Sequence, residues 1–585
     1  NKKANEKRSL IYELKEVKKD KTIVFNVYYS EKGRVTKTED ILKELKKSQI
    51  SIDEEKLERA FRIFEKQSEV DFFINKNAKA FLQEQFKLWS YQYFWEGAKE
   101  WTAERVNQIQ ILKDIAFKII DFVSQFEDEL VKIWNKPKFV KNSNYVITLD
   151  RINNLELIEK ILNHININEQ IKEWQELGIV DDAFKTKDVF ENDIYGKKLT
   201  KKYEHLPIDT KYFKDLELEI LSQFEDLDNA LDGWLIKSEN YQALNTILPK
   251  FKEKVQTIYI DPPFNLDSSD QFLYRTNYKD ANWATLLENR LKLAKDWLNE
   301  KGSIFVRCDY NGNWIVRCLM DDIFNQNLIN EIQVSRISKK GFNANRYPSA
   351  NDHLFVYSKI EEPYFNVLRL EKKSEQEKWH SMDSMSGGRG TGEPRIILGK
   401  LRYPPKNRVW TFSQERIYEM EKQGLIKLNS KGTPIYKVLS QEGEPLDSNW
   451  TDIPGYSSTT GFQTENSEKL LARVINTASQ KNDLIMDFFL GSGTTTAVAH
   501  KLGRKWIGVE MGEHFYSVVL PRMKKVLAYD KSGISKELKT PRQTSSDTPL
   551  QEGDNTPLSP LREGIYQGGG FFKYYELEQY EETLA

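Results

Sequence analysis

The sequence predicts an α/β protein whose chemistry is carried by buried parallel strands, preceded by a mostly α-helical N-terminal region. Two stretches predict this class. The apolar run 258–260 has the composition of a short buried strand, and it ends in the turn Asp261-Pro262-Pro263-Phe264. Far downstream, a second apolar run at 483–487 enters a glycine-rich turn, followed by a helix and the strand 506–510. That order is a βαβ unit, which is typical of a parallel sheet.

The first of these turns is stiffened by its two prolines. Pro262 and Pro263 fix φ, donate no hydrogen bond, and push the residue before each of them toward extended geometry. Asp261 and the carbonyls near Pro262 are therefore left free to accept hydrogen bonds, with Phe264 at the mouth of the turn. A single Asp-Pro-Pro is more often a plain strand-to-loop turn, so the interpretation depends on the second stretch.

The second stretch has the features of a nucleoside site. Gly491 and Gly493 let a ligand approach the backbone, and the N-terminus of the next helix offers free N–H groups. Glu510 closes the following strand, where a carboxylate can bind two ribose hydroxyls. A dinucleotide site would carry a third glycine where Thr496 stands, and a P-loop would carry a Gly-Lys pair, so both of those alternatives are weakened.

In this order, with Asp261-Pro-Pro-Phe264 ahead of Phe489-x-Gly491-x-Gly493, the chain resembles the β-class amino-methyltransferases of DNA. In particular it resembles the modification (Mod) subunits of type III restriction systems. Further short segments that match the family lie at 235–240, 302–306, 353–357, 450–453 and 568–575, so the resemblance covers about residues 230 to 585. It implies a circularly permuted Rossmann-like methyltransferase domain with an inserted target-recognition domain.

The resemblance also implies a reaction: site-specific methyl transfer from S-adenosylmethionine to the N6 amine of an adenine flipped out of double-stranded DNA, in a restriction–modification or phage-defence system. Aspartate rather than serine before Pro-Pro favours adenine over the N4 amine of cytosine. The implied catalytic residues are Asp261, Pro262, Pro263 and Phe264. The implied cofactor-binding residues are Phe489, Gly491, Ser492, Gly493, Thr494, Glu510, Glu239 and Asn240.

Three alternatives stay open at this point. The enzyme could methylate N4 of cytosine, or the chain could be a DNA-recognition subunit that serves a separate nuclease. An intact Asp261 and Gly491 argue against an idle site. The third alternative, a nucleotide-dependent oxidoreductase, is opposed by the absence of the third glycine.

The predicted domains follow from changes of pattern along the chain. They are a helical N-terminal domain at 1–225, the catalytic half of the methyltransferase domain at 226–360, a target-recognition domain at 361–455, the S-adenosylmethionine half at 456–529, and a linker with a C-terminal segment at 530–585. The C-terminal phrase 568–575 is expected to form an edge strand.

Basic residues are concentrated inside the predicted recognition domain. Residues 386 to 410 include six basic residues and only one acidic residue, Glu393. Arginine and lysine at such a place contact phosphates, or read guanine edges. The candidate DNA-binding residues are Arg389, Arg395, Lys400, Arg402, Lys406 and Arg408.

The N-terminal region contains one long amphipathic pattern. Apolar residues recur at gaps of three or four from Ile109 to Ile133, which predicts a helix with one apolar face. An aromatic-rich segment precedes it, from Phe81 to Trp101. Packing within a helical domain is the simpler interpretation, and a dimer or partner surface is the alternative.

Composition limits the remaining possibilities. The chain has 585 residues and a formal net charge of −1, so DNA binding requires positive charge concentrated locally. Two cysteines and six scattered histidines give no metal-binding pattern, and no metal is expected. No long apolar run or signal-peptide core occurs, so we expect a protein of the bacterial cytoplasm with no membrane contact. The expected partners are double-stranded DNA, a second copy of the chain, and a helicase–nuclease restriction subunit.

Overall fold

The computed structural model describes residues 10–17, 22–29, 36–48, 50, 52–69, 77–96, 102–194, 196–265, 280–336, 347, 349–370, 379–385, 392–437, 444–462, 464–538 and 568–579. The chain divides into two compact units. The larger, here called the catalytic unit, comprises Asn1–Phe365, Ser448–Lys539 and Tyr566–Ala585. The smaller, here called the insertion unit, includes Asn366–Asp447.

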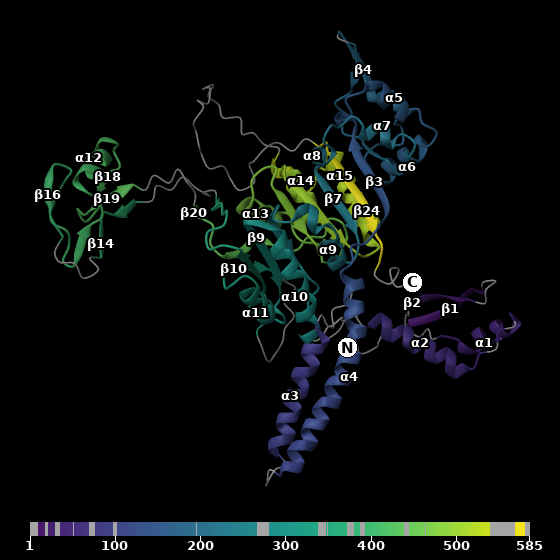
Figure 1. The fold of residues 1–585 in the computed structure, drawn as a ribbon. Helices are drawn as coiled ribbons and strands as arrows, with labels where there is room; N and C mark the ends of the chain where they lie inside the picture. Colours follow the sequence, from purple (N-terminus) through teal and green to yellow (C-terminus); the bar gives the residue numbers. More distant parts are fainter. Residues whose placement is uncertain are drawn as a thin grey trace. The chain divides into compact units, whose positions relative to one another are not determined.

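A single large sheet organises the catalytic unit (Figure 1). Among the described residues it has 11 strands, in the order β21-β10-β11-β9-β8-β22-β23-β7-β24-β3-β6. Their bounds, in that order, are Asn449–Pro454, Leu328–Ser335, Asn351–Ser358, Leu298–Cys308, Val255–Ile260, Leu484–Asp487, Lys505–Glu510, Gly233–Lys237, Phe571–Leu577, Val140–Thr148 and Pro207–Asp209. From β9 to β24 every neighbouring pair is parallel, which places the carboxyl ends of these strands along one edge.

Alternate side chains of the central strands face two different sets of helices. Ile258 and Ile260 of β8, Met486 of β22 and Ile507 of β23 belong to one hydrophobic core with residues of α9, α10 and α11. These helices span Asn240–Phe251, Asp280–Trp297 and Asn313–Ile323. A second set, in which α14 contacts both α13 and α15, spans Glu468–Ala478, Thr494–Lys501 and Leu520–Leu527. The fold is therefore α/β, as the sequence predicts.

In the described residues the N-terminal region is mostly helical, as the sequence predicts, and it also contains several strands. It begins with the antiparallel pair β1 (Leu10–Val17) and β2 (Ile23–Tyr29), then α1 (Thr38–Lys47) and α2 (Glu54–Glu69). Strands β3 and β6, both before residue 225, join the large sheet. The other elements before β7 are α5 (Leu155–Leu162), α6 (Ile167–Glu176), β4 (Phe190–Asp193), β5 (Gly196–Leu199), α7 (Glu217–Leu221) and α8 (Leu227–Ala230).

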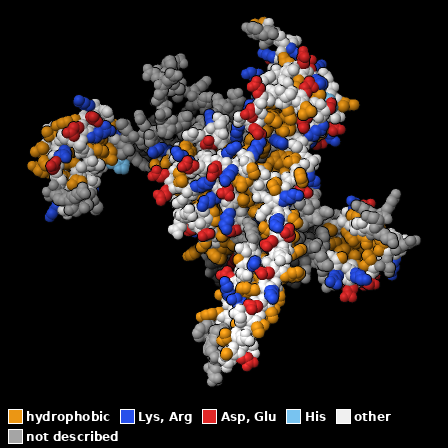
Figure 2. All heavy atoms as spheres, viewed as in Figure 1, with side chains coloured by type: hydrophobic (Ala, Val, Ile, Leu, Met, Phe, Trp, Pro, Cys, Tyr) orange, Lys and Arg blue, Asp and Glu red, His pale blue; other side chains and the backbone are white. Residues whose placement is uncertain are grey.

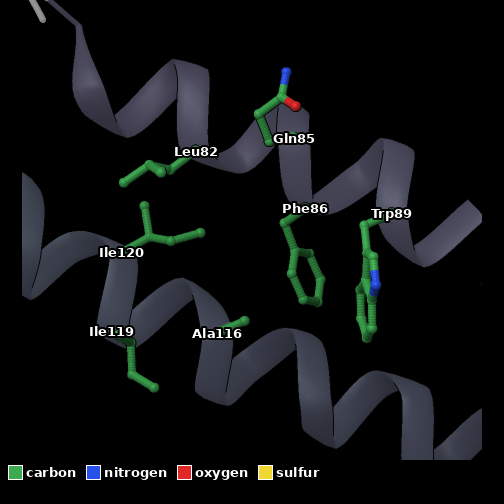
Figure 3. Close-up of a pocket in the computed structure, with 7 residues that line it drawn as sticks. All are labelled: Leu82, Gln85, Phe86, Trp89, Ala116, Ile119 and Ile120. Carbon is green, nitrogen blue, oxygen red and sulfur yellow. The ribbon is translucent and has the colours of Figure 1, made fainter.

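The long amphipathic pattern forms a helical hairpin. Helix α4 spans Ala103–Asn135 and packs against α3, which spans Ala78–Glu96. The predicted long helix is thus confirmed, and Thr102 caps it by accepting a hydrogen bond from the amide of Arg105 at 3.3 Å. An apolar groove runs between the two helices (Figure 3), lined by Leu82, Gln85, Phe86, Trp89, Ala116, Ile119 and Ile120.

The C-terminal strand is not an edge strand. Strand β24 lies between β7 and β3, parallel to the first and antiparallel to the second. Phe571, Phe572 and Tyr574 are buried, so both faces of the strand are covered. The last described segment of the chain therefore completes the sheet that holds the site.

The insertion unit has its own small core, which contains Met382, Ile397, Ile417 and Met420. Its elements are β12 (Arg369–Leu370), β13 (Trp379–Ser381), β14 (Asp383–Met385), β15 (Arg395–Ile397), β16 (Lys400–Arg402), β17 (Arg408–Trp410), α12 (Gln414–Lys422), β18 (Ile426–Leu428), β19 (Pro434–Lys437) and β20 (Glu444–Pro445). The unit begins and ends a few residues inside the predicted limits of 361–455, and β21, predicted within it, belongs to the large sheet.

Candidate active site

The two sequence stretches end on neighbouring strands. Asp261 follows β8 directly, and β22 leads into the glycine turn 491–493. The strands are paired in parallel, with Ile485 opposite Thr257 and Met486 opposite Ile258. The acidic turn and the glycine turn therefore open at the same edge of the sheet, where α/β proteins bind ligands.

A buried tryptophan holds the proline turn in place through a hydrogen bond. Trp283 of α10 is fully buried, and its indole N–H donates to the carbonyl of Pro263 at 2.8 Å. The family resemblance implies that Tyr274 to Tyr278 and Trp283 belong to a region that closes over the substrate, and Trp283 also supports the turn in this structure. Among the described residues nothing donates to the carbonyl of Pro262, which leaves that oxygen as an available acceptor. The rest of the predicted closing region, Tyr274 to Tyr278, lies outside the described residues.

Asp261 lies in a nearly closed, polar environment. Its side chain is 12% exposed, and one carboxylate oxygen, Oδ2, accepts a hydrogen bond from the Asn466 amide at 3.0 Å. The Arg307 guanidinium lies 4.0 Å from the same oxygen. Burial raises the pKa of Asp261 to about 6, although Arg307 and the Asn466 hydrogen bond oppose the rise. The other oxygen, Oδ1, accepts no hydrogen bond within the described part of the chain.

Phe264 is half-buried beside this carboxylate. Its ring centroid lies 5.9 Å from the guanidinium carbon of Arg336, which follows β10. One face of the ring is thus held by a cation. The four predicted catalytic residues, Asp261 to Phe264, form one continuous turn at the strand end.

The glycine turn has the backbone conformation that the sequence predicts. Gly491 and Gly493 have φ values of +56° and +80°, a region that residues with a side chain rarely adopt. Gly493 caps α14, so the amide groups of the first helical turn face the strand edge. Asp487 holds the turn from below, because its carboxylate accepts from the Phe489 amide at 2.9 Å and the Thr495 hydroxyl at 2.6 Å.

Glu510 stands at the end of β23, beside the glycine turn. Its two carboxylate oxygens accept from the amide of Gly491 at 2.9 Å and the amide of Gly512 at 2.8 Å. Each oxygen retains acceptor capacity, since a carboxylate oxygen has two lone pairs. Glu510 is therefore oriented by the turn next to which a ribose would lie.

Ser492 and Thr494 are buried and are used inside the protein. Their hydroxyl groups lie 3.0 Å apart, and the buried Arg522 donates to Thr494 at 2.9 Å. Arg522 also donates to Glu465 at 2.8 Å, which joins the turn to the segment before α13. A ligand would meet these two residues through their backbone rather than their side chains.

Glu239 and Asn240 also have local partners. Glu239 caps α9 by accepting from the amide of Gln242 at 2.9 Å, and it forms an ion pair with Arg290 at 2.5 Å. Asn240 accepts from Arg290 at 2.7 Å and donates to the carbonyl of Phe488 at 2.9 Å. Asn240 therefore links α9 to the segment that leads into the glycine turn. The predicted contact of Glu239 and Asn240 with a cofactor stays a prediction.

Sequence reasoning missed Arg307 and Asn466. Arg307 is fully buried in β9 within the run Ile304-Phe305-Val306, where an arginine is rarely buried unless it is paired. That pattern is the signal from which Arg307 could have been found. Asn466 gives no such local signal, because its partner Asp261 lies far away in the sequence.

The predicted DNA-binding residues divide into two kinds. Arg395 pairs with Glu393 at 3.0 Å, Arg408 with Asp383 at 2.5 Å, and Arg402 donates to the carbonyl of Gly432 at 3.3 Å. Lys400 and Lys406 are exposed, and neither forms an ion pair with any residue of the described structure. Arg389 lies outside the described residues.

Two kinds of feature are absent from the described residues. No three or more histidine, cysteine, aspartate and glutamate side chains come together as a metal site. No helix there is both long enough and apolar enough to cross a membrane.

Sequence comparison identifies the class to which this fold and site belong. The family model described as a DNA methylase matches residues 255–520, a span that includes both the Asp261 turn and the glycine turn. A type II methyltransferase from Lactococcus lactis subsp. cremoris, M2.LlaDCHI, is 39% identical over 311 residues, which cover 52% of this chain and 93% of that protein. The chain belongs to this family of DNA methylases.

A more particular likeness is to Mod subunits. The probable type III restriction-modification enzyme HindVI Mod subunit of Haemophilus influenzae is 26% identical over 436 residues, covering 60% of this chain and 55% of that protein. The chain thus matches about half the length of that relative. A solved structure titled M1.HpyAVI–SAM complex is 15% identical with a TM-score of 0.28, and the match covers 50% of this chain and 99% of that one. The resemblance predicted from the motifs is confirmed by the family and the Mod relatives.

Proposed function

We propose that the protein transfers a methyl group from S-adenosylmethionine to an exocyclic amine of a base in double-stranded DNA, at a specific sequence. The observation that carries this proposal is the parallel pairing of β8 with β22, which opens the Asp261 turn and the Gly491 turn at one edge. One turn offers acceptors for an amine, and the other offers a backbone that a nucleoside cofactor can approach.

The residues of the glycine turn fit S-adenosylmethionine. Gly491 and Gly493 carry no Cβ, the first amides of α14 face the edge, and Glu510 is held beside them. These groups would bind the methionine part and the ribose of the cofactor. Bound there, the cofactor would supply an electrophilic sulfonium methyl group.

Asp261 and the Pro262 carbonyl would activate the amine. The lone pair of an exocyclic amine is delocalised into the base, and acceptors for its two hydrogens draw the nitrogen toward sp³ geometry. With the cofactor bound, the freed lone pair could take the methyl group from the sulfonium, and Asp261 would accept the proton that the amine releases and pass it to solvent. Positioning and preorganised electrostatics are the main catalytic terms in such a step.

Phe264 would stack on the base. The amine cannot reach Asp261 from inside a duplex, so the base must leave the helix at a cost of a few kcal/mol. Stacking on an aromatic ring returns about 1–3 kcal/mol. The pair of Phe264 with Arg336 keeps the ring in place for this contact.

Adenine N6 is the proposed acceptor, because aspartate stands before Pro-Pro, and cytosine N4 is the alternative. The insertion unit would recognise the target sequence, with Arg389, Arg395, Lys400, Arg402, Lys406 and Arg408 as the proposed DNA contacts. The Mod relatives support a place in a restriction–modification or phage-defence system, with a second copy of the chain and a restriction subunit as proposed partners.

Asp261→Ala tests the reaction. We expect methyl transfer to mixed-sequence plasmid DNA to fall by about 10²–10³-fold or more, because the variant loses a preorganised acceptor. Cofactor affinity measured by calorimetry should be unchanged, since the glycine turn is untouched. Mass spectrometry of the digested nucleosides would identify the modified base. Undiminished transfer by the variant would refute the role given to Asp261.

A further inference from the structure

Asn466 connects Asp261 to a buried arginine. Its amide nitrogen donates to Oδ2 of Asp261 at 3.0 Å. Its amide oxygen accepts from the Arg307 guanidinium at 2.5 Å and from the Tyr259 hydroxyl at 3.0 Å. The side-chain amide of Asn466 thus bonds to Asp261, the first residue of the proline turn, and to two residues next to it in the sheet.

The direction of the Asn466 amide is set by the chemistry of its neighbours. Arginine only donates hydrogen bonds, so the amide oxygen must face Arg307. The NH2 group must then face Asp261, because a rotated amide would set NH2 against a guanidinium and oxygen against a carboxylate. Asn466 is therefore a donor of fixed direction.

Arg307 is itself immobilised. It is fully buried, with its guanidinium donating to Asp352 at 2.7 Å and to the Gly455 carbonyl at 2.9 Å. Its other support is the ring of Tyr456, whose centroid lies 4.0 Å from the guanidinium carbon. Arg307 of β9, which bonds to Asn466, is thus itself held by residues of β11 and of the segment after β21.

We propose that Asn466, held by Arg307, is a positioning residue that occupies one oxygen of Asp261 and turns the other toward the reacting amine; this inference rests on the proposed function. A direct arginine–carboxylate pair would engage both oxygens in a fork and leave neither fully open to the substrate. The observed arrangement avoids this, because Arg307 stays 4.0 Å from Asp261 and the neutral amide intervenes. One oxygen is fixed and the other is open.

The same contact favours the ionised form of the acceptor. A hydrogen bond donated to a carboxylate lowers its pKa, so the Asn466 bond counteracts part of the rise that burial causes at Asp261. The charged groups around Asp261 come from three strands or their ends, β9, β11 and β22. They are Arg307, Asp309, Asp352 and Asp487.

The test is the pH dependence of methyl transfer by the full chain. In Asn466→Ala we expect transfer at neutral pH to fall by about 10–100-fold, the usual effect of losing a hydrogen bond to a charged group. Loss of the donor raises the pKa of Asp261, so the acid limb of the kcat profile should move to higher pH and part of the activity should return in alkali. Cofactor affinity should not change.

Two further variants separate positioning from folding. Asn466→Asp keeps the shape but sets a second carboxylate beside Asp261, and the shared proton should move the acid limb further than alanine does. Asn245→Ala, at a half-buried position of α9 whose side chain donates to the Asn135 carbonyl, should retain the parental profile. An acid limb that stays in place in both Asn466 variants, at full or uniformly reduced activity, overturns the inference. Absence of transfer by the parent protein would instead overturn the proposed function.

Discussion

Asp487 illustrates how the site affects stability at the level of one residue. It is almost fully buried, and burial raises its pKa to about 7, despite the hydrogen bonds from Thr495 and Phe489. The unfolded chain has an aspartate pKa near 3.8. Between these two values the folded protein binds a proton that the unfolded chain does not, so the free energy of unfolding falls as pH rises through this window.

Replacing Asp487 by asparagine should flatten that dependence. Asparagine keeps an acceptor for Thr495 but does not titrate, so its unfolding free energy should change less between pH 4 and pH 7. One pKa unit corresponds to about 1.4 kcal/mol, which urea titrations at several pH values resolve. Asp181→Asn, at an exposed position after α6, is the control and should keep the parental slope. Equal slopes in parent and Asp487→Asn would contradict the assignment.

Local sequence predicted the residues whose chemistry depends on their own neighbours in the chain. Asp261 is defined by the two prolines after it, and Gly491 and Gly493 by the positive φ of the turn. Asn466 could not be found in this way, because its role comes from contacts with residues about 160 to 205 positions away. Only the folded sheet brings these residues together.

At the level of elements, strand existence was predictable and strand order was not. The C-terminal phrase was read correctly as a strand, and β24 spans Phe571–Leu577. Its place between β7 and β3 depends on pairings with residues more than 300 positions distant, for which local composition holds no signal. The near-continuous apolar and aromatic character of β24 fits a strand covered on both faces.

The β15–β16 hairpin is the element on which DNA binding can be tested. Lys400 of this hairpin and Lys406, in the loop after β16, are exposed, whereas three neighbouring arginines have partners within the unit. In the double variant Lys400→Ala, Lys406→Ala we expect weaker binding of duplex DNA. The slope of log affinity against log salt should decrease by about 1–2, because each lost phosphate contact removes about 0.9.

Fluorescence anisotropy over a range of salt concentrations measures this slope. Lys431→Ala removes an exposed lysine elsewhere on the same unit and serves as the control. If the double variant and the control have the same slope as the parent, these lysines do not contact phosphate.

At the level of the whole molecule, the α3–α4 hairpin carries an exposed apolar patch larger than the patches usually found on monomeric proteins. Figure 2 shows hydrophobic side chains along it. The exposed ones are Phe81, Leu88, Trp89 and Tyr91 of α3, and Val106, Ile111, Leu112, Ile115, Ile119, Phe122, Val123 and Phe126 of α4. At roughly half exposure, these side chains leave on the order of 800 Å² of apolar surface in contact with solvent. That area equals the surface that one partner buries in a standard protein–protein interface, and it exceeds the largest apolar patch of a typical monomer.

A second copy of the chain is the proposed partner for this surface. Five of the exposed residues of α4, from Ile111 to Phe126, recur at gaps of four, four, three and four, so these five form one stripe along the helix. Two such hairpins can pair their stripes about a twofold axis as a four-helix bundle, which buries both at once. The groove of Figure 3 runs along the same hairpin, on elements other than those that carry Asp261.

Charge on the C-terminal half of the stripe should therefore separate the subunits. Phe122 and Phe126 are 77% and 67% exposed, so substituting both by lysine should cost the folded monomer little. Light scattering after size exclusion should give twice the chain mass for the parent and the chain mass for the double variant. Asp128→Lys, on the opposite side of α4, adds comparable charge and should leave the parental mass unchanged. A parent that elutes as a monomer at all concentrations would exclude this pairing, and a variant that stays dimeric would place the interface elsewhere on the chain.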